Sequence, residues 1–255
     1  MKDKIIYFSG TGNTKLLAEK LGELLNVEAH SIEEKIDWMS YLTNSRRLII
    51  LYPVYFSVPP MILREFFDHY AVALENKEMI CIVSQMCYSG DGARVVEDFL
   101  PSSAKLIDTH HINMPNNIPN IPFVPLATSG EIRRKVSRGL RKLTKIADGI
   151  KKENFKRRHT SKFSILLGQS QRNGGLKSEK SKKSSVRVND DCISCGLCVR
   201  ICPTNNFVME NKAVPLGECT LCLRCENKCP AKAITVIIDR PVKRVYPGPG
   251  QSVRR

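Results

Sequence analysis

Two copies of one cysteine pattern occupy the last third of the chain. Residues 192–203 and 219–230 both read C-x2-C-x2-C-x3-C-P, and together they contain eight of the ten cysteines. Disulfide-rich domains occur mainly in exported proteins. Residues 1–8 instead enter a strand-like run, without the charged start, apolar stretch and cleavage site of a secretory signal. The crowding therefore predicts metal ligands in a reducing compartment, and we expect a cytoplasmic protein.

The spacing within each copy indicates iron-sulfur clusters. Three thiolates this close together can hold three corners of one cubane, while the fourth lies beyond a helical turn and reaches the cluster of the other copy. We therefore expect two 4Fe-4S clusters with crossed ligation. The expected ligands are Cys192, Cys195, Cys198 and Cys229 for one cluster, and Cys219, Cys222, Cys225 and Cys202 for the other. Two four-cysteine zinc sites are the alternative, but zinc explains neither the third evenly spaced cysteine nor the trailing proline.

Residues 186–239 resemble a bacterial-type two-cluster ferredoxin along their whole length, with every ligand present. The resemblance implies clusters that carry single electrons at low potential. The two other cysteines lie far from these motifs. Cys81 sits in an apolar strand-like run and is expected to be a core residue, whereas Cys87 belongs to a loop described below.

Strand-like and helix-like segments alternate through the first 153 residues. Apolar runs predict strands, and apolar residues at helical spacing predict the helices between them. The expected strands are 4–8, 48–52, 79–84 and 105–112, and the expected helices are 14–25, 60–74, 92–100 and 131–152. This order is typical of an α/β doubly wound parallel sheet with helices on both faces. A smaller α+β domain is expected in the cysteine-rich region.

A loop rich in small and hydroxyl residues follows the first expected strand. It consists of Ser9, Gly10, Thr11, Gly12, Asn13 and Thr14. Glycines permit a sharp turn and close backbone approach, and hydroxyls with the first amides of a helix can hold a phosphate. A plain strand-to-helix turn with a threonine cap is the alternative. The loop lacks the third glycine of a dinucleotide fingerprint and the G-K-[ST] of a nucleoside triphosphatase.

Residues 1–150 resemble a flavodoxin, because the SGTGNT loop is similar to the FMN-phosphate loop of that family. The resemblance implies a flavodoxin-like fold with the flavin beyond the carboxyl ends of the strands. Two further loops there are expected to flank the flavin ring. They contain Pro53, Val54, Tyr55 and Phe56, and Ser84, Gln85, Met86, Cys87, Tyr88, Gly90, Asp91 and Gly92.

Composition divides the chain into four predicted parts. Residues 1–153 form the FMN-binding domain and residues 154–185 a basic linker rich in Gly, Ser and Lys. Residues 186–240 form the two-cluster domain, and 241–255 a basic tail. We place the flexible connection between the domains in the linker.

The net charge of +15 is concentrated near this linker. The basic residues there are Arg133, Arg134, Lys135, Arg138, Arg141, Lys142, Lys145, Lys151, Lys152, Lys156, Arg157 and Arg158. Such a stripe can be a solvated helix face, or it can bind nucleic acid, an anionic membrane surface or an acidic protein. No nucleic-acid motif accompanies it, so we favour docking of acidic redox partner proteins. No apolar run is long enough to span a bilayer.

Together the two halves resemble the flavodoxin-ferredoxin fusion proteins of anaerobic microbes. The resemblance implies electron transport, because FMN exchanges one or two electrons and each cluster exchanges one. We expect low-potential electrons to pass between FMN and the two clusters and on to redox partner proteins. One alternative is a flavin-dependent, ferredoxin-type reductase acting on a small substrate beside Cys87, Tyr88 and Asp91. Another is an iron-sulfur regulator that binds nucleic acid. Against the reductase, the sequence shows no acid/base dyad beside these loops and no nicotinamide fingerprint.

Overall fold

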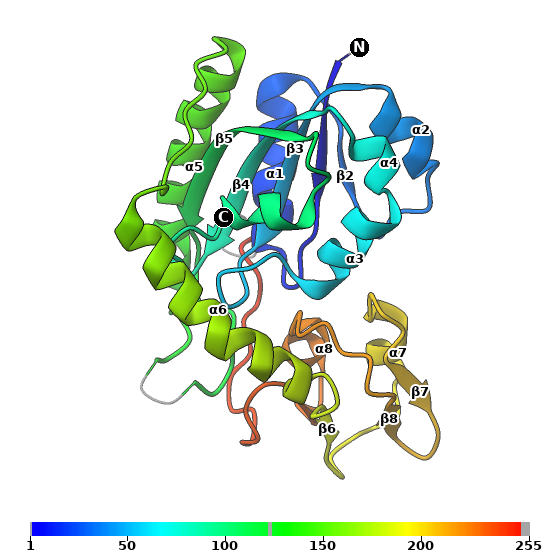
Figure 1. The fold of residues 1–255 in the computed structure, drawn as a ribbon. Coiled ribbons are helices and arrows are strands. Elements are labelled where there is room, and N and C mark those ends of the chain that lie inside the picture. Colours follow the sequence, from blue (N-terminus) through cyan, green and yellow to red (C-terminus); the bar gives the residue numbers. More distant parts are fainter. Residues whose placement is uncertain (1, 122–123, 251–255) are drawn as a thin grey trace.

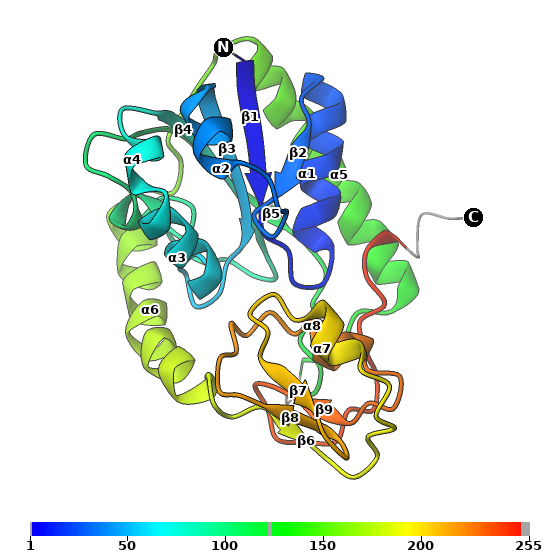
Figure 2. The same cartoon turned by 90° about the vertical axis from the view of Figure 1, so that its right-hand side faces the viewer.

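The computed structural model describes residues 2–121 and 124–250, which form two units (Figure 1). The larger unit is a sheet with helices on both faces. The smaller unit lies below the carboxyl ends of the strands in both Figure 1 and Figure 2. Residues 251–255 of the predicted tail lie outside the described residues. No helix within the described ranges combines the length and apolar character that crossing a membrane requires.

Five parallel strands form the sheet in the order β2-β1-β3-β4-β5. They are β1 (Lys2–Tyr7), β2 (Ala29–Ser31), β3 (Ser45–Pro53), β4 (Glu78–Gln85) and β5 (Lys105–Asn113). This is the flavodoxin-like order of doubly wound sheets, with a switch point between β1 and β3. It confirms the predicted α/β fold class. β2 was not predicted, because three half-buried residues carry no clear pattern.

Helices cover both faces of the sheet, and β3 and β4 are therefore buried along almost their whole length. On one face lie α1 (Asn13–Leu25) and α5 (Ser129–Lys151), and on the other α2 (Trp38–Thr43), α3 (Met61–His69) and α4 (Ala71–Leu74). α5 begins with a capping box formed by Thr128 and Glu131. Its apolar stripe, which includes Ile132 and Leu143, packs on the sheet.

Two predicted helices differ in the structure. The segment 60–74 is divided at Tyr70 into α3 and α4. The segment 92–100 contains only a 3-10 helix, η1 (Val95–Phe99). Gly92 disfavours helix at one end, and Leu100 precedes Pro101 and is extended at the other, so few residues remain for α-helical turns.

The predicted linker contains a long helix, α6 (Lys162–Lys182). Its N-terminus is capped by Ser161, whose hydroxyl accepts a hydrogen bond from the Ser164 amide at 3.2 Å. Its small residues let it approach the loops beyond β3 and β4: a Cβ added at Gly175 would lie 2.0 Å from the Cβ of Phe56. The segment connects the two units, but as a packed helix rather than as the flexible tether its composition suggested. The domain boundaries stay a prediction.

The smaller unit consists of two short antiparallel strand pairs and two helices. β6 (Arg187–Val188) pairs with β9 (Ile234–Thr235), and β7 (Phe207–Met209) pairs with β8 (Ala213–Pro215). α7 (Leu197–Ile201) and α8 (Arg224–Lys228) begin at equivalent positions of the two cysteine patterns. Each of β6 and β9 is only two residues long.

Candidate functional site

A cavity of about 290 Å³ lies at the carboxyl ends of the parallel strands. Loops after β1, β3, β4 and β5 form its wall on the side of the sheet. This edge contains the switch point, where doubly wound sheets bind their ligands. Residues from α6 and from the smaller unit complete the wall, so the cavity lies between the two units.

Most of the predicted flavin-site residues line this cavity. They are Ser9, Gly10, Thr11, Asn13, Thr14, Pro53, Val54, Tyr55, Phe56, Ser84, Gln85, Met86, Cys87 and Tyr88. Gly12, Gly90, Asp91 and Gly92 are not among its lining residues. Asp91 is fully buried and pairs with the guanidinium groups of Arg94 and Arg172. Because Arg172 belongs to α6, Asp91 holds that helix against the loop instead of facing a ligand.

The loop after β1 is shaped to receive an anion. The Ser9 hydroxyl accepts a hydrogen bond from the Gly12 amide at 3.2 Å, and the Thr14 and Ser84 hydroxyls lie 2.8 Å apart. α1 begins at Asn13 without a side-chain cap, so the amides of its first turn have no partner within the helix. These amides and the helix dipole favour a phosphate here.

Part of the cavity wall was missed by the sequence reasoning. Ser57 and Ser89 belong to the two loops expected to flank the flavin, and the missed residues are Met114, Pro115, Asn117, Ile118, Gln171, Leu221, Leu223 and Ile237. The residues after β5 could have been predicted to line the site, because the carboxyl end of this parallel strand lies on the same edge of the sheet. Those from α6 and the smaller unit could not, because only the packing of the two units brings them here.

The smaller unit touches the phosphate loop directly. A Cβ added at Gly10 would lie 2.1 Å from the carbonyl oxygen of Cys222. Because that obstacle is backbone, only glycine fits at position 10. The Arg224 guanidinium donates to the carbonyl oxygens of Ser9 and Gly10, and it pairs with Glu33 at 2.7 Å. One expected cluster ligand therefore lies against the cavity loops.

The chain after β9 extends this interface. The Tyr246 hydroxyl donates to Asn13 at 2.6 Å, and the Tyr246 amide donates to Asn227 at 2.7 Å. Asn227 in turn donates to the carbonyl oxygen of Asn117 at 3.0 Å. Tyr246 is 1% exposed, so this segment packs as part of the structure and ties the smaller unit to the loops around the cavity.

The loop after β3 contains a two-residue turn. Tyr55 and Val58 exchange backbone hydrogen bonds of 3.1 and 3.0 Å, and Phe56 and Ser57 between them have φ angles of 52° and 62°. Left-handed backbone is costly for residues other than glycine and persists where packing enforces it. Phe56 packs against Gly175 of α6. The turn and the helix together fix the position of Tyr55 in the cavity wall.

Two further hollows contain the cysteine motifs. Cysteines at one are Cys192, Cys195, Cys198 and Cys229, and those at the other are Cys202, Cys219 and Cys222, while Cys225 borders both. Cys202 thus lies with the second copy and Cys229 with the first, as crossed ligation requires. We call the expected sets the distal site (Cys192, Cys195, Cys198, Cys229) and the proximal site (Cys202, Cys219, Cys222, Cys225), by their distance from the cavity.

The cysteine spacing suits clusters better than single ions. A zinc site needs four ligands around one ion, whereas each iron of a cubane takes one thiolate. Burial raises the pKa of Cys222 to about 12 and that of Cys219 to about 11. Buried thiols of this kind lose their protons to a bound metal and are poor nucleophiles without one.

The remaining cysteines differ from these. Cys81 is fully buried in β4, as expected for a core residue, and burial raises its pKa to about 12. Cys87 is exposed and lines the cavity. His110 pairs with Asp108 at 2.8 Å within the larger unit.

Residues 186–207 and residues 216–232 match two family models, each described as a 4Fe-4S binding domain. The chain is also similar to three solved structures. A flavodoxin from the domain Archaea shares 16% identity with a TM-score of 0.42, covering 59% of this chain and 99% of that one. Oxidised flavodoxin 2 from Bacillus cereus shares 18% with a TM-score of 0.41, covering 60% and 99%. General stress protein 14 from Treponema denticola, in complex with FMN, shares 14% with a TM-score of 0.37, covering 58% and 98%.

No curated protein matches the chain. The structural likenesses are distant, and the strand order establishes the fold of the larger unit without them. The smaller unit contains both segments that match family models. The chain thus combines a flavodoxin-like α/β fold with two segments that match models of 4Fe-4S binding domains.

Proposed function

We propose that this chain is an electron-transfer protein that carries electrons between FMN and two 4Fe-4S clusters. One observation supports this above all: the cavity beyond the flavodoxin-like sheet is also lined by Leu221 and Leu223, which flank Cys222 of the proximal site. A flavin in this cavity would lie beside the proximal cluster. Such a neighbour is expected in a protein that passes electrons between the two groups.

The cavity residues fit the parts of FMN. The loop after β1 offers amides and hydroxyls for the phosphate, and Tyr55 and Tyr88 offer aromatic faces for the ring system. Gln85 has a different task, because its side chain accepts hydrogen bonds from Ser89 and donates to Asn113 at 2.7 Å. It therefore shapes the loop after β4. Bound FMN supplies one- and two-electron exchange, while the chain positions it and excludes water.

The different exposure of the two sites supports an order of transfer. The proximal cysteines Cys219, Cys222 and Cys225 are buried beside the cavity, whereas Cys195 of the distal site is exposed. Electrons would therefore pass between flavin and proximal cluster, between the two clusters, and between the distal cluster and a partner. The order is the same for either direction of flow.

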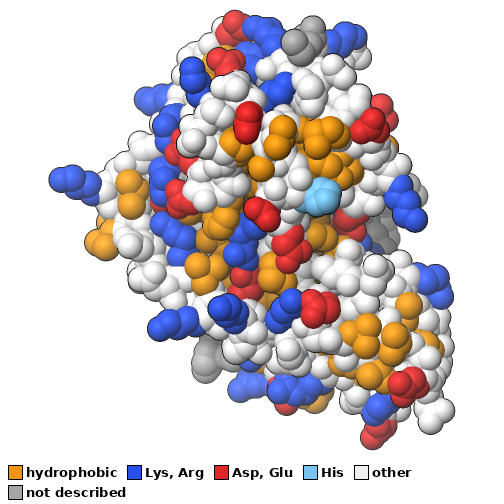
Figure 3. Space-filling model, turned by 45° about the vertical axis from the view of Figure 1, so that its right-hand side comes forward, with side chains coloured by type: hydrophobic (Ala, Val, Ile, Leu, Met, Phe, Trp, Pro, Cys, Tyr) orange, Lys and Arg blue, Asp and Glu red, His pale blue; other side chains and the backbone are white. Residues whose placement is uncertain are grey.

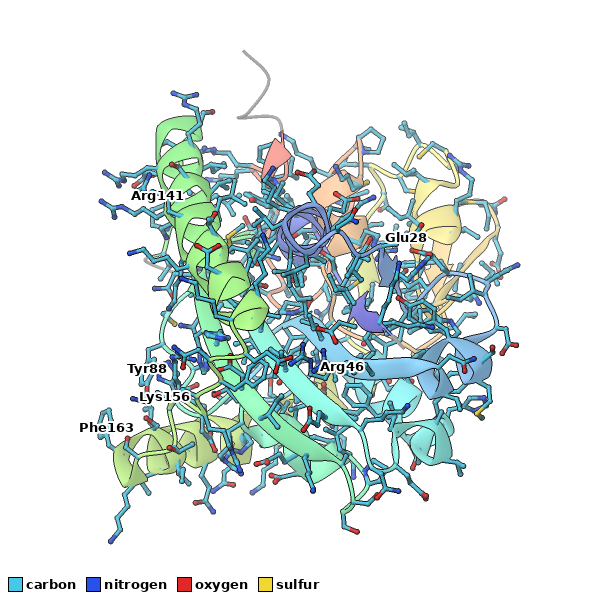
Figure 4. All side chains as sticks on the ribbon, turned by 90° about the horizontal axis from the view of Figure 1, so that it is seen from above. Glu28, Arg46, Tyr88, Arg141, Lys156 and Phe163 are labelled. Carbon is cyan, nitrogen blue, oxygen red and sulfur yellow. The ribbon has the colours of Figure 1, made fainter. Side chains whose placement is uncertain are left out.

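The surface charge favours an acidic redox protein as a partner. Cations that line one hollow on α5 are Arg138, Arg141, Lys142 and Lys145. Figure 4 labels Arg141 on α5 at the outer edge of the molecule. Opposite charges accelerate weak encounters. Arg157 and Arg158 pair instead with Glu97 and Asp108, so the stripe is shorter than the sequence suggested.

Charge reversal tests this docking. Changing Arg138, Arg141 and Lys145 to Glu should slow the second-order rate with an acidic partner at low ionic strength, and added salt should slow the wild type likewise. Transfer within the chain should not change. If the partner rate stays flat in both comparisons, the stripe is a solvated helix face.

Only two of the three residues expected beside the substrate of a reductase line the cavity. Cys87 and Tyr88 line the cavity, but Asp91 is buried in ion pairs behind it. Steady-state turnover of a small acceptor in the absence of any protein partner would favour the reductase over the carrier.

Cofactor content tests the proposed function as a whole. Protein purified anaerobically should contain roughly eight iron atoms and one FMN per chain, because eight cysteines fill two cubanes and one phosphate loop serves one flavin. Metal analysis and absorption spectroscopy measure both. Stoichiometric zinc without broad iron-sulfur absorption, or full iron with no flavin, would contradict the proposal.

A further inference from the structure

The hydroxyl of Tyr55 is buried and has no hydrogen-bond partner in the part of the chain that the structure describes. A buried hydroxyl without a partner is costly, so native proteins almost always satisfy such groups. The Tyr55 backbone is fixed by the turn to Val58, which leaves little freedom to turn the side chain elsewhere. We therefore expect a hydrogen-bond acceptor that is not part of the described chain to bind beside this hydroxyl.

The surroundings of this oxygen identify that group. A Cβ at Gly10 would lie 3.1 Å from the Tyr55 hydroxyl and 2.1 Å from the carbonyl oxygen of Cys222, so the hydroxyl lies close to the backbone of a proximal ligand. The charged or ionisable groups that act on it are Cys222, Arg224 and Cys219. Two of these belong to the proximal site. The Tyr55 side chain thus forms part of the wall between the flavin cavity and the proximal site.

We propose that Tyr55 donates its hydroxyl hydrogen bond to the sulfur ligands of the proximal cluster and thereby raises the reduction potential of that cluster. The inference rests on the proposed function, since it requires the cluster to be bound. Reduction adds one electron to the cluster, and Tyr55 keeps its proton throughout. A donor to sulfur stabilises the more negative, reduced cluster, and such hydrogen bonds are among the factors that set cluster potentials.

This role makes Tyr55 a positioning residue for electron transfer. Tyr55 lines the flavin cavity and its hydroxyl lies close to the Cys222 backbone, so with both groups bound this side chain would lie between them. A higher potential at the proximal cluster would favour the electron on the cluster next to the flavin. The distal site meets water at the exposed Cys195, so its potential is set by different surroundings.

The test is Tyr55→Phe in the full chain loaded with both clusters and FMN. Potentiometric titration followed by electron paramagnetic resonance measures each cluster separately. The one-electron equilibrium at the proximal cluster should shift about 3- to 10-fold toward the oxidised form, as loss of one hydrogen bond predicts. A tenfold shift equals about 59 mV to more negative potential. The distal cluster should not change.

Tyr41→Phe is the matched control, because it removes a tyrosine hydroxyl whose hydrogen-bond partner, the carbonyl oxygen of Ile5 at 3.5 Å, lies within the larger unit and outside the cavity. It should leave both cluster potentials unchanged. As a second variant, 3,5-difluorotyrosine at position 55 keeps the ring and makes the hydroxyl a stronger donor. It should shift the proximal potential in the opposite direction to Tyr55→Phe. It replaces Tyr55→Phe as the test if that variant loses iron.

Three results would overturn the inference: an unchanged proximal potential, equal shifts of both clusters, or a shift confined to the flavin. Each requires a loaded protein, so each is distinguishable from failure of the proposed function, in which the wild type itself lacks iron or FMN.

Discussion

The two cysteine segments have the same motif in opposite surroundings. In the proximal segment Cys219 and Cys222 are 7% and 6% exposed, whereas in the distal segment Ile193 is 65% exposed beside Cys192. Thr220 stands at the position equivalent to Ile193 and is 1% exposed. Figure 3 shows hydrophobic side chains gathered on the surface of the smaller unit, at lower right. The proximal site is therefore enclosed by the larger unit, whereas the distal site faces solvent.

The backbone follows the same course in both segments. Ser194 and Gly196 have φ angles of 52° and 69°, and the equivalent Leu221 and Leu223 have 57° and 60°. Leucine in left-handed backbone costs roughly 1–2 kcal/mol per residue. The proximal copy keeps two leucines in this conformation, and both line the cavity. The second copy of the motif therefore contacts the cavity, whereas no residue of the first copy is among the lining residues.

The largest expected effect is the loss of one cluster when one of its cysteine ligands is removed. Cys202→Ala should remove the proximal cluster, although Cys202 belongs to the first segment in sequence, and should leave roughly four iron atoms in the distal cluster. Cys229→Ala should do the reverse. Iron analysis and electron paramagnetic resonance measure both. Loss of the distal cluster in Cys202→Ala would reverse the crossed assignment.

The next effect concerns the contact between the proximal segment and the phosphate loop. Gly10→Ala places a Cβ 2.1 Å from the Cys222 carbonyl oxygen, so the two units must move apart. The rate of electron transfer falls as the distance between two redox groups increases. Transfer from flavin to proximal cluster, measured by flash photolysis, should slow accordingly. Gly130→Ala is the control, since nothing lies within 4 Å of its added Cβ, and equal rates in the two variants would contradict a tight interface.

A smaller effect tests the leucines of the proximal copy. Leu223→Gly relieves the left-handed backbone but removes an apolar side chain from the cavity wall, so FMN affinity should fall by about tenfold, in keeping with loss of part of a buried leucine. Global stability should change less, because the relieved strain offsets part of the lost burial. Equilibrium titration of flavin fluorescence measures the affinity. Ser194→Gly, at a left-handed position of the distal copy, should leave FMN affinity unchanged; a similar loss there would show that the two copies do not differ in this respect.

A pH-dependent effect on stability defines the range in which the two segments can be compared. Burial, and then the neighbouring His159 and Lys142, lower the pKa of His111 to about 3. The unfolded chain takes up this proton near pH 6.5, so the stabilisation is complete above that pH and is lost as the pH falls toward 3. The loss is at most about 1.4 kcal/mol per pH unit.

His111→Phe should make the stability of the larger unit less dependent on pH over this range. Urea unfolding followed by the fluorescence of Trp38, the single tryptophan, measures it. His69 is exposed, and His69→Phe should leave the pH dependence as in the wild type. If His111→Phe has the same slope as the wild type, the buried histidine does not account for acid sensitivity.

The fold and half of the site could be predicted from the sequence because their signals are local. Alternating apolar segments predicted β1, β3, β4 and β5, and the SGTGNT loop and the cysteine spacing each lie within a dozen residues. α6 was missed because glycines and serines usually mark a tether, and only its packing on Phe56 and Asp91 explains them. Leu221 and Leu223 were missed because contact between the units depends on tertiary packing, which no local pattern records.

The cavity contacts the proximal segment, so we expect an electron from the flavin to reach the proximal cluster before the distal one. Photoreduction of the flavin in fully loaded protein, followed by rapid freezing and electron paramagnetic resonance, measures where the first electron arrives. The Cys202→Ala variant identifies the signal of the proximal cluster. We predict that the proximal signal rises first and that the distal signal follows from it. A distal signal that rises first, or that keeps its wild-type rate in Cys202→Ala, would contradict it.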